Sequence, residues 1–268
     1  MNQVIQNPPY CTRRPKRTPL LKGKLPQFVF VAGVEGSGHH ALKDVWWALE
    51  DSGTKLKLVV YDQLFHSLGI ENHASFHYSS IRKESYISAM KPLFEDAARD
   101  GAFVVDAQNS YPMGKGAGVL AHPDLVMMEE LDGILYDFKV IVLYRDPVNA
   151  TLSAVRRFQN DEEYLYKNHG FQARMVSENL ATINNALPLM PCGKTLAIRY
   201  EDLTTHPEKL VGPMSNLLGV SKGVINKAFA KLHPHQGSPD SPKKAADRRL
   251  LNVFFKLQKV MWPLLESA

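Results

Sequence analysis

The chain has 268 residues, 44% of them hydrophobic, which is enough to bury one sizeable α/β core. Its 32 Lys and Arg against 27 Asp and Glu give a net charge of +5, which favours an anionic ligand but is too small to indicate a nucleic-acid-binding protein. Cys11 and Cys192 have no metal-binding or redox spacing, so we expect neither a zinc site nor a disulfide framework.

The first 25 residues differ in composition from the rest of the chain. Residues 1–25 contain four prolines among basic side chains, so we expect a flexible basic tail in front of a single domain spanning 26–268. A docking or targeting role for this tail is the alternative. The sequence contains no signal-peptide pattern and no run of eighteen apolar residues, which predicts a cytoplasmic protein without a transmembrane segment.

Five apolar runs have the composition of strands buried in a parallel sheet. In chain order they are Phe28–Ala32, Lys55–Tyr61, Gly101–Asp106, Lys139–Tyr144 and Thr195–Tyr200. Helical spacing predicts helices at Ala41–Leu49, Ile81–Arg99, Leu125–Tyr136, Pro147–Gln159, Phe171–Leu187, Thr205–Leu218, Val224–Leu232 and Ala245–Leu265. This alternation predicts an α/β fold of three layers, with a mainly parallel five-stranded sheet flanked by helices.

Single residues refine the expected helix ends. Pro92 should kink or split its helix, because proline removes a backbone hydrogen bond. Asp146 is a good N-cap, and Pro147 suits the first helical position. Residues 205–208 have the Thr-x-x-Glu form of a capping box, and Gly219 should close the helix that it starts.

A glycine-rich turn follows the first strand and leads into a helix. Glycines allow backbone N–H groups to approach an anion, and the helix N-terminus favours negative charge, so the pattern predicts a phosphate cradle. A plain tight turn is the alternative, because the turn has His39 where a nucleotide triphosphatase has its lysine. The residues that form the predicted cradle are Gly33, Gly36, Ser37, Gly38, His39 and His40.

A second anion site is predicted at the end of the fourth strand. Arg145 ends this strand directly before a helix, so its guanidinium lies at the same sheet edge as the glycine turn. Ser153 lies two turns along that helix. If both residues hold one phosphate and the turn holds another, the ligand is a nucleotide with two separated phosphate groups. Alternatively, Arg145 caps its strand and Ser153 is a small surface residue.

Three segments together carry a resemblance to a known family. They are Phe28–Leu42 with Ser37-Gly38, Val140–Phe158 with Arg145 and Ser153, and Leu196–Leu218 with Tyr200-Glu201-Asp202-Leu203. In this order they resemble the 5′-phosphosulfate loop, the 3′-phosphate motif and the Tyr-Glu-Asp-Leu segment of the sulfotransferases that use 3′-phosphoadenosine 5′-phosphosulfate. Their order and spacing agree with the family, and they cover about a third of the chain.

The resemblance implies a P-loop-type fold and a reaction. It implies transfer of a sulfuryl group from 3′-phosphoadenosine 5′-phosphosulfate, bound as co-substrate, to a hydroxyl or amine of a small-molecule or carbohydrate acceptor. It also implies that Tyr200 approaches the adenine and that no metal is required. The expected nucleotide-binding residues are Gly36, Ser37, Gly38, His39, His40, Arg145, Ser153 and Tyr200.

The chain departs from the family pattern in two places. Many members have a lysine or arginine directly before the Ser-Gly pair, where this chain has Gly36; Lys43 is a cation that could reach inward instead. The family's glycine-rich basic loop near the C-terminus has no clear match. The basic candidates for a second 3′-phosphate contact are Lys243, Lys244, Arg248 and Arg249.

The general base is expected near the end of the third strand, by resemblance. Asp106 is the acid in that neighbourhood, and we predict that it takes the acceptor proton, although it could instead cap the loop or hold a histidine. His40 and His122 are the reserves, because neutral imidazole is a natural base near pH 7. His66, His73 and His77 lack the carboxylate or cysteine partner that would complete a metal site.

Two other functions fit parts of the sequence. A P-loop kinase or nucleotide triphosphatase would use Asp106 to position Mg²⁺, but the turn lacks the Lys-Ser/Thr pair. A nucleotide-binding module without catalytic turnover is the other alternative, because the loop lacks a cation at Gly36. Acceptor contacts are expected from the segments 66–80, 107–122 and 161–170.

Overall fold

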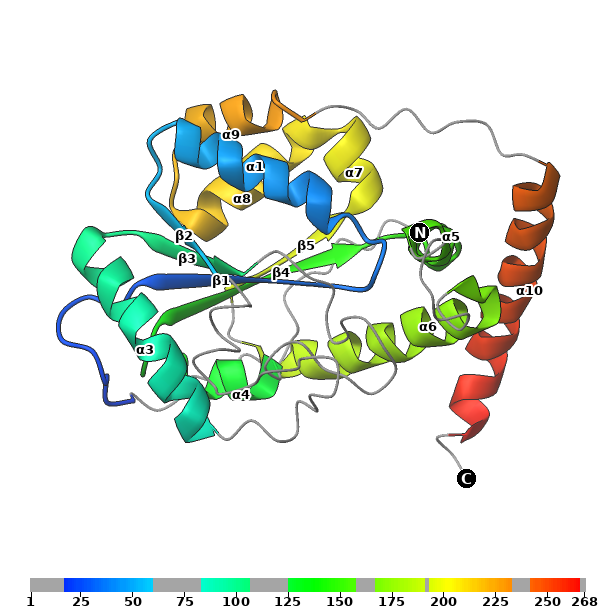
Figure 1. The fold of residues 1–268 in the computed structure, drawn as a ribbon, viewed down its shortest axis with the longest axis horizontal. Coiled ribbons are helices and arrows are strands. Elements are labelled where there is room, and N and C mark those ends of the chain that lie inside the picture. Colours follow the sequence, from blue (N-terminus) through cyan, green and yellow to red (C-terminus); the bar gives the residue numbers. More distant parts are fainter. Residues whose placement is uncertain are drawn as a thin grey trace.

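A computed structural model describes residues 17–59, 83–106, 125–157, 167–190, 193–232 and 242–265, with side chains for all of these except 242–244 and 257–265. Helices cover both faces of a central sheet (Figure 1). No helix in these ranges is both long and apolar enough to cross a membrane.

Among the described residues the sheet has five strands in the order β2-β3-β1-β4-β5, and every neighbouring pair is parallel. This confirms the predicted parallel five-stranded α/β architecture. The central strand β1 is buried along almost its whole length, as its uninterrupted apolar run predicts. The strands are β1 Gln27–Gly33, β2 Leu56–Leu58, β3 Phe103–Asp106, β4 Asp137–Tyr144 and β5 Thr195–Arg199.

Alternate residues of β1 face two separate cores. Phe28 and Phe30 pack on one side, where the Phe28 ring lies 5.3 Å from that of Phe94 and 4.8 Å from that of Tyr136. Val29 and Val31 pack on the other. The first core is covered by α3 Lys83–Asp100, α4 Leu125–Glu130 and α6 His169–Ala186; the second by α1 His39–Asp51, α7 Tyr200–Thr205, α8 Val211–Leu218 and α9 Lys222–Phe229.

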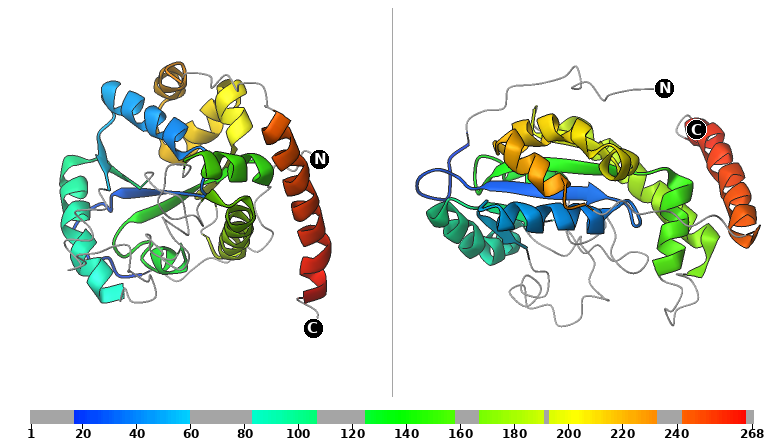
Figure 2. Two further views of the ribbon diagram at one scale, coloured as in Figure 1. Left: turned by 45° about the vertical axis from the view of Figure 1, so that its right-hand side comes forward. Right: turned by 90° about the horizontal axis from the view of Figure 1, so that it is seen from above.

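Two helices stand at the carboxyl end of the strands. α5 Pro147–Arg157 follows β4 directly, and α10 Pro242–Leu265 packs on α5 and α6 at the outer end of the molecule (Figure 2). Asp146 Oδ1 accepts a hydrogen bond from the N–H of Asn149 at 3.0 Å, which confirms Asp146 as the N-cap of α5. Arg248 on α10 donates to Asn149 Oδ1 at 2.7 Å and holds the two helices together.

Two local predictions about helices were wrong, and a third was wrong in part. Pro92 does not split its helix, since α3 continues through it; Pro92 is exposed, so water can satisfy the carbonyl that loses its partner. The predicted helix to Tyr136 ends at Glu130, because Gly133 adopts a φ of 74° and Asp132 accepts from the N–H of Phe138 at the start of β4. Thr205 caps no helix; its hydroxyl donates to the Glu201 carbonyl behind it, and a 3₁₀ turn, Pro207–Leu210, precedes α8.

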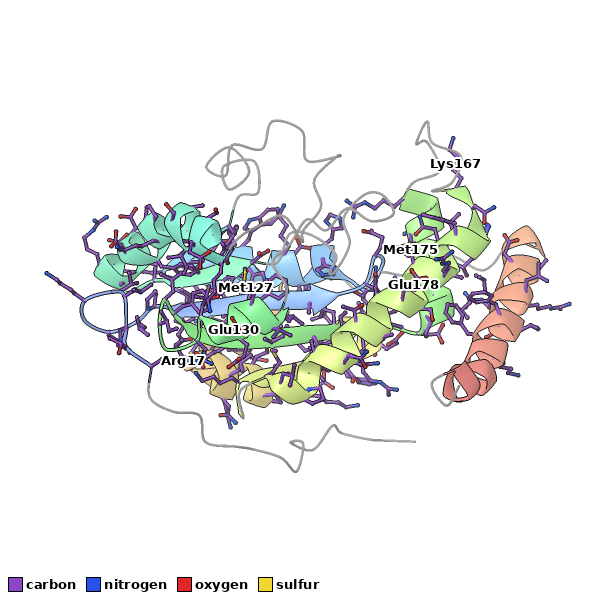
Figure 3. The ribbon with its side chains drawn as sticks, turned by 90° about the horizontal axis from the view of Figure 1, so that it is seen from below. Arg17, Met127, Glu130, Lys167, Met175 and Glu178 are labelled. Atoms are coloured by element: carbon purple, nitrogen blue, oxygen red, sulfur yellow. The ribbon has the colours of Figure 1, made fainter. Side chains whose placement is uncertain are left out.

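The described part of the N-terminal segment packs against the body of the protein. Leu21 is buried, and the N–H of Leu20 donates to the Ile134 carbonyl at 2.8 Å. Arg17 Nη1 donates to the carbonyls of Glu129 at 2.7 Å and Asp132 at 3.1 Å. Figure 3 shows Arg17 beside α4. The predicted tail of 1–25 therefore joins the folded body from residue 17 onward, and residues 1–16 lie outside the described ranges.

Candidate functional site

The turn after β1 aims the start of α1 at the carboxyl edge of the sheet. Gly36 and Gly38 have φ values of 79° and 111°, in the left-handed region that glycine tolerates best. The first bond of the helix runs from the N–H of Leu42 to the Gly38 carbonyl at 3.2 Å. The N–H groups of Gly38 through Ala41 therefore precede the intrahelical ladder, and no side chain in the described ranges caps them.

Packing from two later helices explains why these two positions need glycine. A Cβ on Gly36 would overlap the Ala150 carbonyl of α5 and lie 3.0 Å from Ser153 Cβ. A Cβ on Gly38 would overlap the ring of Tyr200. The turn is thus enclosed by the elements that carry the predicted 3′-phosphate serine and the predicted adenine contact.

Strand register places Arg145 beside Tyr200. Tyr144 pairs with Arg199, so the next residue of each strand lies at the same level of the sheet edge. The guanidinium of Arg145 stacks over the Tyr200 ring, 4.0 Å from its centroid, and Nη1 donates to the Gly36 carbonyl at 2.7 Å. Burial lowers the pKa of Arg145 from its ordinary value, but arginine remains charged at neutral pH. One fixed cation therefore connects the glycine turn, β4 and α7.

These elements enclose a cavity of about 680 Å³, a size typical of small-ligand sites. Three arginines and two histidines lie on its wall with two carboxylates, so the wall is rich in cations and N–H donors. The lining residues are Glu35, Gly36, Gly38, His39, His40, Ala41, Asp44, Arg145, Ser153, Arg156, Arg157, Tyr200 and Thr204.

Seven of the nine predicted site residues share this cavity. Two do not line it. Ser37 is fully buried behind the turn, where its hydroxyl occupies the space that a side chain on Gly33 would need. Asp106 is also buried, and it pairs with Phe30 of β1, three residues before that strand ends. At about 3.3 Å per residue, Asp106 lies roughly 10 Å short of the turn along the strand direction.

His39 lies against the inner wall of the cavity. Burial, with smaller contributions from His40 and Arg157, lowers its pKa from 6.5 to about 3, so the ring is neutral at pH 7. A hydrogen bond to the backbone of Val31 holds the ring, whereas its Nε2 atom has no hydrogen-bond partner among the described residues. His39 therefore offers a neutral polar atom and no charge.

His40 faces the cavity from the first turn of α1. Arg157 Nη1 lies 3.4 Å from its Nε2 atom and 3.0 Å from Glu35 Oε1. The side chain of Arg157 is half exposed and that of Glu35 is one fifth exposed. α5 thus contributes a cation to the cavity wall, Arg157, that is held between the glycine turn and α1.

The fold matches that of solved sulfotransferases. The crystal structure of a sulfotransferase from Alicyclobacillus acidocaldarius aligns with a TM-score of 0.50 and 19% identity, over 86% of this chain and 91% of that chain. The chain has the sulfotransferase fold. The sulfotransferase domain from the curacin biosynthetic pathway aligns with a TM-score of 0.43 and 17% identity, over 83% of each chain. A sugar kinase from Janibacter sp. HTCC2649 aligns with a TM-score of 0.40 and 15% identity, over 74% of this chain and 98% of that chain. No family model and no curated protein matches the sequence.

On this sulfotransferase fold, sequence reasoning missed several residues that line the cavity. Helical spacing from the predicted residues would have found most of them. Arg156 and Arg157 follow Ser153 by three and four positions, Asp44 follows His40 by four, and Thr204 follows Tyr200 by four. What the sequence lacks is any sign that α5 lies across the glycine turn.

The other basic residues that were predicted to contact the nucleotide either do not line the cavity or lie outside the described ranges. Lys43 lies over the exposed Trp47 ring, 4.5 Å from its centroid, and does not line the cavity. Arg248 contacts Asn149, one helical turn before Ser153, and Arg249 is exposed. The side chains of Lys243 and Lys244 are outside the described part of the chain, as are all of 66–80 and 107–122 and most of 161–170, including His66, His73, His77 and His122.

The site combines three kinds of anion contact without a cluster of metal ligands. In the described ranges, no three His, Cys, Asp or Glu side chains lie together as a metal site. The N-terminus of α1, the guanidinium of Arg145 and the hydroxyl of Ser153 each suit phosphate oxygens. The aromatic face of Tyr200, already covered by Arg145, borders the same space. Such a cavity can bind a nucleotide with more than one anionic group.

Proposed function

We propose that this protein is a sulfotransferase that uses 3′-phosphoadenosine 5′-phosphosulfate. The observation that carries the proposal is the position of Arg145, which is bound to the Gly36 carbonyl and stacked on Tyr200. This arrangement puts a fixed cation and an aromatic ring beside an uncapped helix N-terminus in one cavity. The sulfotransferase fold supports the same conclusion.

Unsatisfied polar atoms around the cavity fit a polyanionic ligand. Arg145 Nε and His39 Nε2 are buried and have no hydrogen-bond partner among the described residues. Buried polar groups normally have partners, so a ligand that supplies oxygen acceptors and donors would complete this wall. We assign the 5′-phosphate end to residues 38–41 and the 3′-phosphate to Arg145 with Ser153, while Tyr200 borders the adenine.

The reaction requires charge stabilisation and one proton transfer. An acceptor oxygen or nitrogen forms a bond to sulfur as the bond from sulfur to the 5′-phosphate oxygen breaks, and the leaving phosphate keeps that electron pair. The N–H groups at the start of α1 stabilise the leaving phosphate. The acceptor proton passes to a base, and His40 is better placed than Asp106, since His40 lines the cavity and Asp106 does not.

The test is thermal unfolding with and without nucleotides. A ligand that binds only the native state raises the melting temperature, with a stabilisation of about 2.7 kcal/mol at 100 times its Kd. We expect adenosine 3′,5′-bisphosphate to raise Tm and ATP with Mg²⁺ to leave it unchanged. A shift with ATP alone would favour a kinase and overturn the proposal, as would the absence of any shift with the bisphosphate.

The assignment of Arg145 has its own test with the same ligand. Arg145→Ala should weaken binding of adenosine 3′,5′-bisphosphate by about 1.5–3 kcal/mol, the contribution of a charged hydrogen bond, while 5′-AMP binding changes little because it has no 3′-phosphate. Isothermal titration of both nucleotides measures the difference. Equal losses for the two ligands would remove Arg145 from the 3′-phosphate site.

A further inference from the structure

The glycine turn itself offers no positive charge to the group that is transferred. Gly36 has no side chain, Ser37 faces the interior, and His39 is neutral at pH 7 because burial lowers its pKa to about 3. The N–H groups of α1 bear only partial charges. A cation for this end of the cavity must therefore come from another element.

Arg157 is the cation that reaches this end. It lies one helical turn beyond Ser153 on α5, and Ser153 packs beside Gly36. Arg157 Nη1 is 3.0 Å from Glu35 Oε1 and 3.4 Å from His40 Nε2, so the guanidinium lies between the turn and the first turn of α1. Arg145 also touches the turn, at the Gly36 carbonyl, but its guanidinium is stacked on the Tyr200 ring and not on the His40 side. Two of the three arginines on the cavity wall, Arg145 and Arg157, are thus held at separate places.

Glu35 holds Arg157 in that position. A carboxylate on the wall of an anion-binding cavity repels the ligand unless a cation neutralises it. The Glu35–Arg157 pair has an exposed side, so it is weak enough to exchange partners when a doubly charged ligand enters. The planar guanidinium can then contact two oxygens at once.

We propose that Arg157 contacts the terminal sulfuryl group of the donor, and so distinguishes the loaded nucleotide from the spent one. This inference rests on the proposed function. Arg157 forms no covalent bond during the reaction. It stabilises the negative charge on the sulfuryl oxygens while the group passes from the 5′-phosphate to the acceptor.

The contact also links binding of the donor nucleotide to the availability of His40 Nε2 as a proton acceptor. Arg157 donates to Nε2 of His40, which requires that this nitrogen carries no proton. A guanidinium that turns to the sulfuryl group leaves the Nε2 lone pair available to the acceptor proton. The Nε2 atom of His40 then faces the cavity with no bond to Arg157.

The experiment compares two nucleotides that differ by the sulfuryl group. Isothermal titration gives Kd values of 3′-phosphoadenosine 5′-phosphosulfate and adenosine 3′,5′-bisphosphate for the wild type and for Arg157→Ala. We expect Arg157→Ala to weaken binding of the sulfated nucleotide by about tenfold or more, as for loss of a charged hydrogen bond, and binding of the bisphosphate by less than about threefold. Arg157→Lys keeps the charge without the planar fork and should fall between wild type and Arg157→Ala.

Two control variants make the outcomes distinct. Arg145→Ala should weaken both nucleotides, and Arg174→Ala, which removes an exposed cation on α6 paired with Glu178, should weaken neither. If Arg157→Ala changes both nucleotides equally, or neither, the assignment of Arg157 is overturned while the proposed function stands. If the wild type binds neither nucleotide, the proposed function itself fails.

Discussion

At the scale of single residues, the site depends on Arg145 and His39, which differ in charge although both are partly or fully buried. Arg145 stays charged, because its guanidinium has Tyr200 and the Gly36 carbonyl as partners. His39 loses its charge, because desolvation dominates its environment. The sequence shows both residues in the right segments. It cannot show their protonation, since burial depends on the packing of α5 and α7 around the turn.

His39 should make the protein less stable in acid. Its pKa is about 3 in the folded protein against 6.5 unfolded, so between these values the unfolded chain binds more protons. The free energy of unfolding therefore falls as pH drops below 6.5, by on the order of 2 kcal/mol at pH 5. His39→Asn, which keeps a polar group near Val31 and cannot become charged, should flatten this slope in urea unfolding between pH 7 and pH 5.

His206 provides the matched control for that measurement. Its side chain is about half exposed, so His206→Asn should keep the slope of the wild type. If His39→Asn loses stability with acid as steeply as the wild type, another group causes the loss and His39 is not held neutral by burial.

At the scale of elements, the glycines of the turn are needed for packing against later helices and not only for binding a ligand. The sequence predicts the strand, the turn and the helix correctly, because buried strands and amphipathic helices have strong periodic patterns. It suggests that the glycines open space for a phosphate. In the structure, Gly36 and Gly38 also make room for α5 and Tyr200, which come more than a hundred residues later in the chain.

Gly38→Ala should destabilise the protein more than an ordinary glycine substitution. Alanine is strained at the left-handed φ of 111°, and its Cβ would also overlap the Tyr200 ring. Gly53→Ala is the matched control, because Gly53 has a φ of 86° and nothing within 4 Å of its Cβ position. We expect a cost of about 1–2 kcal/mol for Gly53→Ala from the backbone alone, and roughly 1–3 kcal/mol more for Gly38→Ala from overpacking.

Urea unfolding of the two variants measures this difference, and a double variant identifies its cause. Adding Tyr200→Ala to Gly38→Ala removes the overlapping ring, so the two substitutions together should cost less than the sum of their separate costs. Additive costs would mean that Tyr200 does not press on the turn. Equal costs for Gly38→Ala and Gly53→Ala would lead to the same conclusion.

The two wrong predictions of helix ends have different causes. The apolar spacing through Tyr136 and the Thr-x-x-Glu pattern at 205–208 are both compatible with helices locally. The first fails because Asp132 bonds to Phe138 of β4 and to Lys194, whose Nζ lies 2.9 Å from Oδ1. The second fails locally, because the Thr205 hydroxyl donates to the Glu201 carbonyl one turn back and does not cap the next helix.

At the scale of the whole molecule, parallel register brings three distant segments to one sheet edge. The sequence predicts this convergence, since strand ends followed by helix starts meet at the carboxyl edge of a parallel sheet. It does not predict that β1 extends three residues beyond the level of Asp106, or that Asp106 does not line the cavity. The choice of Asp106 as base came from the resemblance and from its being the acid at the end of the third strand, and it stays a prediction.

Hydrogen exchange should show directly whether one ligand contacts all three segments at this sheet edge. Adenosine 3′,5′-bisphosphate should slow amide exchange in the glycine turn, in the β4–α5 junction and at the start of α7, because openings that release the ligand become rarer. At about 100 times Kd the slowing approaches a hundredfold for such openings. α3 lies at the opposite end of the sheet and provides the internal control for locally exchanging amides (Figure 1). Slowing confined to the glycine turn would indicate a ligand held by a single phosphate, and the joint site of Arg145, Ser153 and Tyr200 would then be wrong.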